Sequence, residues 1–328
     1  MLRPTIAVCI PTYNQSRFLA TAVESAIGQT LACEIWVADD ASTDDTPAVM
    51  EELKKRFPNV HYHQQRQNLG IMGNPTWVMK QSDAEFIVRL DSDDILKPDY
   101  VRKLLGVLEN HPQAGCAHAA VQEIGEDGQE RRLRLLARNA GLQNGEESLR
   151  ASVSGYRVAA NICMFRSAAL KQADYYRDLS FCEDWDLAVR LADAGWGNVY
   201  IDEVLASYRA WETPVRIRRK LAEINGCRRV IEESLIPAFA RRNWDLSPIL
   251  RSRRQLALRH AESLRTKHFT TEEKAALKEA LCRLGDSPAL RWKFRWVQTP
   301  LAGLFQLPHT AMSRLKLVAK KILFARSR

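Results

Sequence analysis

The sequence predicts an α/β protein with a mostly parallel β-sheet flanked by helices, followed by a helical and basic C-terminal region. Short apolar runs alternate with amphipathic stretches from residue 6 to residue 110, a pattern typical of strand–helix–strand units. Two of the predicted strands run directly into aspartate clusters, at Asp39–Asp40 and at Asp91–Asp94. The charge balance then reverses near residue 211, which indicates two regions with different roles.

Four apolar runs in the N-terminal part have the length and composition of buried strands. They are Ile6–Ile10, Glu34–Ala38, Val60–His63 and Phe86–Leu90. The stretches between them predict helices at Phe18–Gln29, at Pro47–Phe57, and from the Asn68–Gly70 turn to Gln81. Helices in these places are the crossovers that join parallel strands. The carboxyl ends of such strands meet at one edge of the sheet, so both aspartate clusters are expected there.

The pattern is less regular in the middle of the chain. Pro98 stands where a helix tolerates proline best, and it opens a predicted helix at Asp99–Asn110. Residues 130–150 contain several arginines and glycines and are expected to form a loop-rich excursion. Further strands are expected at Gly115–Gln122 and Val158–Phe165, and further helices at Ser167–Gln172, from Glu183, and at Arg216–Arg229, Ser247–Arg265 and Thr271–Arg283.

Composition places the chain among globular proteins with a sizeable core, since 46% of its 328 residues are apolar. The seven cysteines are scattered and form no Cys-x-x-Cys pair, so we expect reduced thiols rather than a zinc site or disulfide framework. No signal peptide and no apolar run of membrane-spanning length is evident. We therefore expect a cytoplasmic location.

The stretch Phe86–Tyr100 carries the strongest chemical indication. Asp91, Asp93 and Asp94 directly follow a buried strand, and three neighbouring carboxylates are costly unless a cation offsets their repulsion. Their oxygens suit Mg²⁺ or Mn²⁺, ions that commonly bridge phosphates. The alternative is an acidic turn that caps the next helix. Neither Gly-x-Gly-x-x-Gly nor a P-loop motif is present, which disfavours dinucleotide and P-loop sites.

Four motifs follow one another in order: Ile-Pro-Thr-Tyr-Asn, Val-Ala-Asp-Asp-Ala-Ser-Thr-Asp-Asp-Thr, Asn-Leu-Gly-Ile-Met-Gly-Asn and Leu-Asp-Ser-Asp-Asp. As a set they resemble the nucleotide-sugar half of family 2 glycosyltransferases, which have the GT-A fold. The resemblance implies nucleotide-sugar contacts from Pro11, Thr12, Tyr13, Asp39, Asn68, Asp91 and Ser92. It also implies that Asp93, together with Asp91, binds Mn²⁺ or Mg²⁺.

A second informative stretch begins at Glu183. Glu183 and Asp184 stand at a predicted helix start, where the helix dipole stabilises negative charge, so a purely structural role is one interpretation. The stretch is also similar to the Glu-Asp motif of the family. That similarity implies that Asp184 is the general base that deprotonates the acceptor hydroxyl, with Glu183 as its neighbour. Asp186 is expected on the surface, and Arg190 is expected to be a structural partner of the acids.

One departure from the family pattern concerns the metal. Many relatives carry a Tyr-Arg-x-His segment whose histidine helps to bind the metal, whereas this chain has Trp211 at that position. The metal site is therefore expected to rely on aspartate and diphosphate ligands, or to be weaker. A non-catalytic homologue that only binds a nucleotide-sugar is the corresponding alternative.

The C-terminal region is strongly basic. Residues 1–210 carry 22 Lys and Arg against 29 Asp and Glu, a net charge of −7, whereas residues 211–328 carry 26 against 10, a net charge of +16. Tryptophan and phenylalanine lie among basic residues at 291–296, and Thr310–Arg328 is partly amphipathic. The region 291–328 could therefore contact an anionic membrane surface. For the whole region 213–328 the alternatives are a helical bundle packed on the preceding domain and a homo-oligomer contact.

The resulting prediction is a GT-A catalytic domain at residues 1–212 and a helical basic region at 213–328. The expected function is inverting, metal-dependent transfer of a sugar from a nucleotide-diphosphate donor, most simply a UDP-sugar, to a hydroxyl of a glycan or glycolipid. Inversion is expected because the chain offers one base and no evident second nucleophile. Bacterial surface polysaccharide synthesis, on the inner face of the cell membrane, is the expected setting. A nucleic-acid-binding protein using residues 211–328 is the rival from another class, although the acidic N-terminal part makes nucleic acid an unexpected partner.

Overall fold

The computed structural model describes residues 5–155, 158–159, 161–211 and 216–297. Its strands are β1 (Ile6–Thr12), β2 (Glu34–Asp39), β3 (Val60–Gln64), β4 (Phe86–Arg89), β5 (Ile95–Leu96), β6 (Ala114–Ile124), β7 (Glu130–Arg134), β8 (Gly141–Gln143), β9 (Cys163–Arg166) and β10 (Gly197–Arg209). They form one sheet in the order β3-β2-β1-β4-β9-β6-β10-β5, with β7 paired to β6 and β8 to β10.

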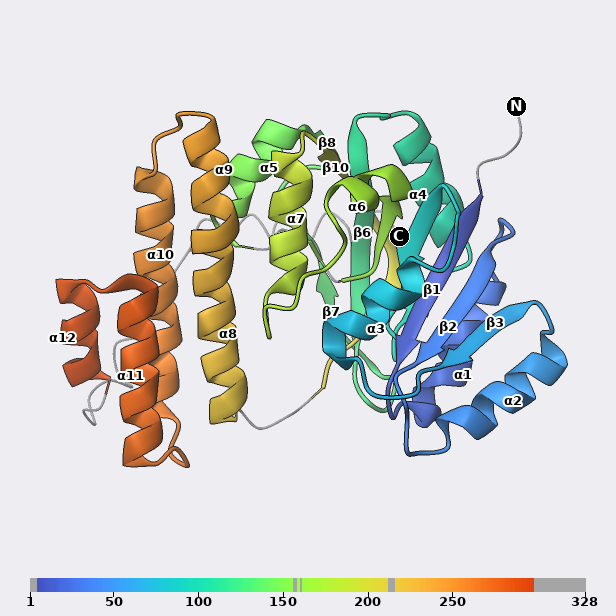
Figure 1. Cartoon of the computed structure of the whole chain (residues 1–328), viewed down its shortest axis with the longest axis horizontal. Helices are drawn as coiled ribbons and strands as arrows, with labels where there is room; N and C mark the ends of the chain where they lie inside the picture. Colours follow the sequence, from blue (N-terminus) through green and yellow to red (C-terminus); the bar gives the residue numbers. More distant parts are fainter. Residues whose placement is uncertain (1–4, 156–157, 160, 212–215, 298–328) are drawn as a thin grey trace.

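Helices cover both faces of this sheet (Figure 1). In the N-terminal part they are α1 (Ser16–Ile27), α2 (Thr46–Arg56), α3 (Gly70–Met79), α4 (Tyr100–Glu109), α5 (Gly145–Ser152), α6 (Ser167–Gln172) and α7 (Glu183–Asp193). The described C-terminal helices are α8 (Ile217–Val230), a π-helical turn (Ile231–Leu235), α9 (Ile236–Arg241), α10 (Ser247–His260), a 3₁₀ turn (Ala261–Arg265), α11 (Thr271–Gly285) and α12 (Pro288–Trp296). The predicted α/β fold class is confirmed.

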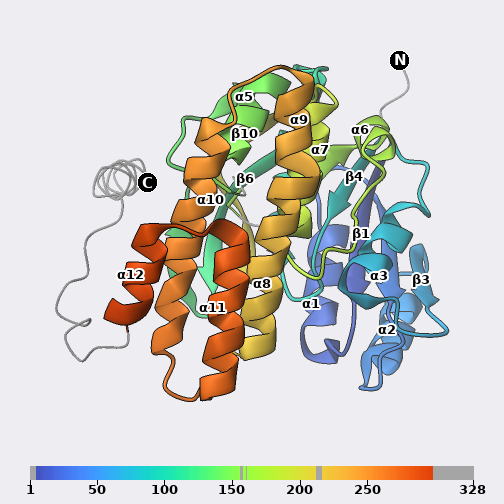
Figure 2. The same ribbon diagram turned by 60° about the vertical axis from the view of Figure 1, so that its left-hand side comes forward.

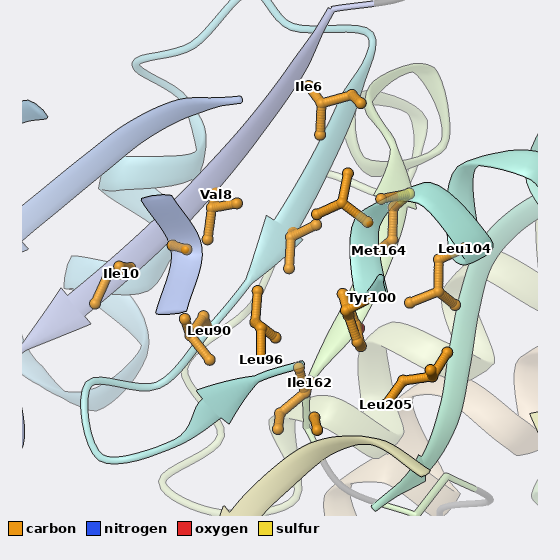
Figure 3. Packing of buried hydrophobic residues seen from close by; sticks show 14 of the residues in the cluster. Ile6, Val8, Ile10, Leu90, Leu96, Tyr100, Leu104, Ile162, Met164 and Leu205 are labelled. Carbon is orange, nitrogen blue, oxygen red and sulfur yellow. The ribbon is translucent and has the colours of Figure 1, made fainter. Parts of the chain in front are cut away.

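Strand β1 shows how the sequence pattern builds two cores. Successive side chains of a strand point to opposite faces, so Ile6, Val8 and Ile10 enter a core with α1, α2 and α4, whereas Ala7 and Cys9 enter a core with α3, α6 and α7. All seven residues of β1 are buried, as expected for a strand covered on both faces. Figure 3 shows the first core, including Ile6, Val8, Ile10, Leu90, Leu96, Tyr100, Leu104, Ile162, Met164 and Leu205.

Most strands of the sheet run in one direction, and β5, β7, β8 and β9 run in the opposite direction. Strands β3, β2, β1 and β4 are parallel, and so are β6 and β10. Strand β9 is antiparallel to both β4 and β6. Because β9 is antiparallel to both of its neighbours, β4 and β6 point the same way. Strands β1 to β4, β6 and β10 therefore share one direction, and the prediction of a mostly parallel sheet holds for these six strands. Strand direction depends on where a connection returns to the sheet, and local sequence patterns do not encode that.

The expectation of a loop-rich excursion at residues 130–150 is wrong. This stretch forms β7, β8 and helix α5. Helix α5 begins with a capping box, because the Asn144 side chain accepts from the Glu147 N–H and the Glu147 carboxylate accepts from the Asn144 N–H. An Asn followed three residues later by Glu is visible in the sequence, so this helix start was available to sequence analysis.

The described C-terminal helices pack as a bundle against the α/β part, and α7 lies between the sheet and α8 (Figures 1 and 2). Leu149 of α5 and both Trp185 and Val189 of α7 belong to the same apolar core as helices α8 to α11. The approach is close at Gly226 of α8, where a Cβ would overlap the carbonyl oxygen of Phe181. The packing alternative for the basic region therefore holds for residues 216–297.

The amphipathic segment at Thr310–Arg328 lies outside the described residues. Within the described ranges, none of the helices combines the length and apolar character needed to cross a membrane.

Candidate active site

A cleft of about 840 Å³ opens where β1 and β4 end. Its lining includes the carboxyl ends of these strands, the first half of α3, the start of α7, and the faces of α8 and α10. The structure brings eight residues predicted from the sequence into this lining: Pro11, Thr12, Tyr13, Asp91, Ser92, Asp93, Glu183 and Asp184.

The end of β1 supplies two different kinds of surface. Thr12 is buried, and its Oγ1 has no hydrogen-bond partner within the part of the chain that the structure describes. Such a group is costly unless a ligand or water satisfies it. Tyr13, in contrast, is 47% exposed, so its ring is available as a flat contact. The two side chains fit a site for a ring system with polar edges.

The loop after β1 is held by the loop after β2. Asn14, with φ of 52°, donates its N–H to Ser42 Oγ at 2.9 Å, and its Oδ1 accepts from the Thr43 N–H at 2.8 Å. Asp44 accepts from the backbone N–H groups of Ser16 and Thr46, both at 3.0 Å. Burial opposes ionisation of Asp44, but hydrogen bonds from Thr46 and Ser16 outweigh it and lower its pKa to about 2. Asp44 therefore fixes the starts of both helices, α1 and α2.

Asp39 and Asn68 lie outside the lining of the cleft. Asp39 is fully buried and accepts from the Ser42 N–H at 2.8 Å and the Tyr62 hydroxyl at 2.9 Å. Asn68 accepts from the Gly70 N–H at 3.0 Å, as expected of the turn interpretation. Their roles toward a nucleotide remain predictions. Asp40, which the sequence analysis did not select, lines the cleft instead.

Arg89 joins the two acidic groups of the site. It is the last residue of β4, and its side chain is only 5% exposed. The N–H groups of its guanidinium donate to two carboxylates. Nε donates to Asp91 Oδ1 at 3.1 Å, and Nη1 donates to Asp184 Oδ1 at 2.8 Å. The guanidinium also lies 4.9 Å from the centre of the Tyr176 ring. Arg89 was not predicted as a site residue, because it belongs to an apolar strand and to no motif.

Trp211 occupies the neighbourhood of the second aspartate of the Asp-Ser-Asp motif. Its Nε1 donates to Asp93 Oδ2 at 2.6 Å, and its ring makes an edge contact with Phe18. Burial raises the pKa of Asp93, whereas the Trp211 hydrogen bond lowers it. The residue that replaces the family's histidine thus contacts the predicted metal ligand directly.

The end of β10 supports the acidic loop from behind. The Arg209 N–H donates to Asp94 Oδ1 at 2.8 Å, and Arg209 Nε donates to the Asp93 carbonyl oxygen at 2.9 Å. Asp94 is 1% exposed, and burial raises its pKa well above the usual range. Asp94 is therefore a structural member of the cluster.

The start of α7 presents Glu183 and Asp184. Cys182, just before the helix, has φ of 68°, and the Trp185 indole donates to the Ser152 carbonyl oxygen at 2.9 Å. Glu183 is 5% exposed, and its Oε1 has no partner among the described residues. Burial raises the pKa of both carboxyls, although Arg89 offsets part of the effect at Asp184. A carboxyl with a raised pKa in a cleft is a candidate general base.

The expectation that Asp186 lies on the surface is wrong, since its side chain is completely buried. It accepts from Arg177 at 3.0 Å, from Arg190 at 2.7 Å and from the Ser234 hydroxyl at 2.5 Å. Arg190 is therefore a structural partner of Asp186 rather than of the two acids before it. This network ties α7 to the C-terminal bundle, a contact that no local pattern reveals.

The remaining wall of the cleft comes from the basic region. It consists of Arg219, Glu223 and Cys227 of α8 with Leu256, Arg259 and His260 of α10. Cys227 Sγ lies 3.5 Å from Cys182 Sγ, next to the start of α7. Sequence analysis placed no site residue here, because these side chains form no motif and converge only through helix packing.

Comparison with protein families identifies the chain. The model of glycosyl transferase family 2 matches residues 7–172, which include β1, β4 and the acidic loop.

The chain belongs to glycosyl transferase family 2.

Curated relatives agree with this family. A chondroitin synthase of Escherichia coli is 27% identical over 194 residues, which cover 58% of this chain and 27% of that protein. A hyaluronan synthase of Pasteurella multocida is 26% identical over 194 residues, or 58% of this chain and 19% of that protein. The chain thus spans about a quarter or less of the length of these relatives.

Solved structures of glycosyltransferases share the fold. TarS 1–349 of S. aureus, in complex with UDP-GlcNAc, superposes with a TM-score of 0.66 at 18% identity, covering 94% of this chain and 95% of that chain. A mannosyltransferase from Pyrobaculum calidifontis, in complex with GDP-Man and Mn²⁺, gives a TM-score of 0.55 at 18% identity, covering 98% and 87%. The likeness to TarS includes the C-terminal helices as well as the family 2 domain, since it covers nearly the whole chain. The predicted GT-A fold is confirmed.

The residues at the acidic loop fit a divalent cation only in part. Asp91 and Asp93 offer hard oxygen ligands of the kind that Mg²⁺ and Mn²⁺ prefer. Among the described residues, however, no group of three or more His, Cys, Asp or Glu side chains is arranged to hold a metal. Asp91 is paired with Arg89, and Asp93 with Trp211. The donor set therefore fits a metal that brings further ligands with it, such as diphosphate oxygens.

Proposed function

We propose that this family 2 protein is an inverting glycosyltransferase that moves a sugar from a nucleotide-diphosphate donor to a hydroxyl of a glycan or glycolipid. The observation that carries the proposal is the position of Arg89. Its buried guanidinium donates hydrogen bonds both to Asp91, on the side of the cleft proposed for the sugar donor, and to Asp184 of α7. A donor-side acid and a candidate base thus face a single cleft. Two reacting partners held in fixed geometry are the main requirement of a direct displacement.

The donor is proposed to be a UDP-sugar. Support comes from TarS, whose structures contain UDP-GlcNAc or UDP, and from the buried Thr12 hydroxyl and exposed Tyr13 ring at the end of β1. We assign the nucleotide to Pro11, Thr12, Tyr13, Asp91 and Ser92, with Asp39 and Asn68 shaping the site from outside the cleft. A role in polysaccharide synthesis is proposed because chondroitin and hyaluronan synthases are among the relatives.

In the proposed mechanism Asp184 accepts the proton of the acceptor hydroxyl as its oxygen attacks the anomeric carbon. Arg89 holds the carboxylate in place through Oδ1, and the Tyr176 hydroxyl is a further hydrogen-bond partner of the same carboxyl group. Glu183 is buried beside Asp184, and its Oε1 has no hydrogen-bond partner in the described part of the chain. We assign Glu183 to orient the acceptor. One base without a second nucleophile gives inversion at the anomeric carbon.

We assign the metal to Asp93 and Asp91, with Mn²⁺ or Mg²⁺ bound together with the donor's diphosphate. Such an ion neutralises the charge that develops on a nucleoside-diphosphate leaving group. The mannosyltransferase that shares the fold was solved with Mn²⁺, which supports this assignment.

A thermal-shift screen of UDP-, GDP- and dTDP-sugars, with and without Mn²⁺, tests the donor and the metal together. We expect a UDP-sugar with Mn²⁺ to raise Tm, since a ligand at about 100 times its Kd stabilises by about 2.7 kcal/mol. Asp93→Ala should abolish the Mn²⁺-dependent part of the shift. Asp83→Ala, a change at an aspartate away from the cleft lining, is the matched control. No shift with any nucleotide-sugar in the wild type would refute the proposed function.

Replacing Trp211 tests the metal site through UDP binding, with no measurement of sugar transfer. Trp211→His removes the hydrogen bond to Asp93 Oδ2 and introduces an imidazole, a good ligand for divalent metals. We expect the Mn²⁺ concentration needed for half-maximal UDP binding to fall by about tenfold, equivalent to one additional interaction of about 1.4 kcal/mol. Trp211→Phe separates the lost hydrogen bond from the gained ligand. Trp292→His, at a 63% exposed tryptophan of α12, is the control, and an unchanged Mn²⁺ requirement in Trp211→His would contradict the assignment.

The pH dependence of transfer reports the environment of Asp184. Burial raises its pKa above the usual aspartate range, and Arg89 offsets only part of that. Because a base must be ionised, kcat/KM should fall on the acid side at a higher pH than an ordinary aspartate would give. Donor affinity measured over the same pH range separates this effect from binding. An acid limb at or below the ordinary aspartate pKa would oppose the assignment.

Other predictions remain proposals. We retain the division into a catalytic domain at 1–212 and a basic region at 213–328, and contact of 291–328 with an anionic membrane surface. In the described part of that segment, Trp292 is exposed and stacks on Trp296, with ring centres 5.5 Å apart. We also propose a homo-oligomer and a cytoplasmic location on the inner face of the membrane.

A further inference from the structure

A second cavity, of about 830 Å³, adjoins the proposed active site. Gln15, Tyr208, Arg219 and Glu223 line both cavities. The two spaces therefore meet at the start of α8, and together they form one path that leads away from the acidic residues. We call the second cavity the side groove.

The side groove is lined mainly by basic side chains. Its lining contains two glutamates, Glu123 and Glu223. It also contains five basic residues, which are Arg131, Arg132, Arg134, Arg219 and Lys220. Three of these lie in strand β7 and two lie in α8. The chain segments involved are far apart in sequence, so the concentration of positive charge arises only in the folded protein.

Both glutamates of the side groove are paired with its basic side chains, and Glu223 Oε2 lies 2.5 Å from Lys220 Nζ. Glu123 is the acid within reach of both Arg132 and Arg134, at 2.9 Å and 4.0 Å. Arg134 also lies 4.5 Å from the centre of the Tyr208 ring, and this ring lines both cavities. Two arginines thus share one carboxylate at the junction, a setting that attracts a further anion.

We infer that the side groove binds the acceptor, and that the acceptor is a glycan chain carrying anionic groups such as phosphate or carboxylate. This inference rests on the proposed function and names the substrate class of the same site. An acceptor hydroxyl has to reach Asp184 through the main cleft, and the rest of the chain then extends along the adjoining space. Arginine guanidiniums are suited to bidentate recognition of phosphate and carboxylate, and Tyr208 offers a flat face for a sugar ring.

Matched polymers test this inference. Fluorescent dextran, carboxymethyl dextran and dextran phosphate share one backbone and differ in charge, and a single-stranded oligonucleotide of similar charge is the fourth probe. We expect the full chain to bind a charged dextran at least tenfold more tightly than neutral dextran, with affinity falling as salt rises. The two charged dextrans separate phosphate from carboxylate recognition. Equal binding of neutral and charged dextran would overturn the inference.

Variants locate the binding. Arg132→Gln combined with Arg134→Gln should weaken binding of the charged dextran by about tenfold, whereas Arg283→Gln, at an exposed arginine of α11 paired with Glu279, should not change it. Should the double variant fail to fold, Arg219→Gln on the exposed face of α8 serves the same purpose. Unchanged affinity in the folded variants, or tighter arginine-dependent binding of the oligonucleotide than of either charged dextran, would refute the assignment.

Binding of UDP-GlcNAc by the wild type is measured in parallel. A protein that binds this donor but does not prefer charged dextran would refute the acceptor inference alone. A protein that binds no nucleotide-sugar would refute the proposed function, whatever it does with the polymers.

Discussion

Asp184→Asn should reduce sugar transfer by about a thousandfold, within the range that general-base catalysis contributes. The amide cannot take the proton of the acceptor hydroxyl. Its carbonyl oxygen can still accept a hydrogen bond from Arg89 Nη1, which in the wild type donates to Asp184 Oδ1 at 2.8 Å. Donor binding should therefore remain nearly intact, because the proposed nucleotide contacts lie on β1 and after β4. Release of UDP in the presence of acceptor measures transfer, and calorimetry measures donor affinity.

Asp174→Asn is the matched control for this prediction. The Asp174 side chain is 88% exposed, and its φ of 53° is a conformation that asparagine tolerates. The same chemical change away from the cleft should leave both transfer and donor affinity unaltered. Full transfer activity in Asp184→Asn would remove Asp184 from the role of base.

Arg89→Met should have the largest effect on stability among the residues of the site. It leaves the carboxylates of Asp91 and Asp184 without the cation they share, and their side chains are only 30% and 16% exposed. Removing one partner of a buried ion pair costs about 3–5 kcal/mol. We therefore expect a lower free energy of unfolding together with loss of transfer, measured by denaturant titration and by UDP release.

The pH dependence of the Arg89→Met effect follows from the same charges. Burial raises the pKa of Asp184 and Arg89 opposes that effect. Without the arginine, the pKa of Asp184 rises further, so protonation of Asp184 stabilises the folded variant. The loss of stability should be smaller at pH 5 than at pH 8. Arg102→Met, at a 53% exposed arginine paired with Asp99, should leave stability nearly unchanged at both pH values. An equal loss at both pH values would indicate that packing, rather than charge, explains the effect.

The N-terminal half of the fold could be predicted because its determinants are local. The apolar runs of β1, β2 and β4, and the helices between them, follow from side-chain periodicity, and the strand ends then place Thr12 and Asp91 at one edge. The Glu183–Asp184 helix start was also readable. The elements at residues 130–150 were not predicted, although the Asn144 capping box was present.

The sequence by itself determined the family, the α/β order of the elements and the acids of the site, because these depend on motifs and on periodic burial. Only the tertiary structure decided that Arg89 bridges Asp91 and Asp184, that Trp211 contacts Asp93, and that Asp186 is buried. It also decided that α8 and α10 complete the cleft. Each of these contacts joins segments that are brought together by packing, and the energy of a buried charge depends on the partners that packing supplies.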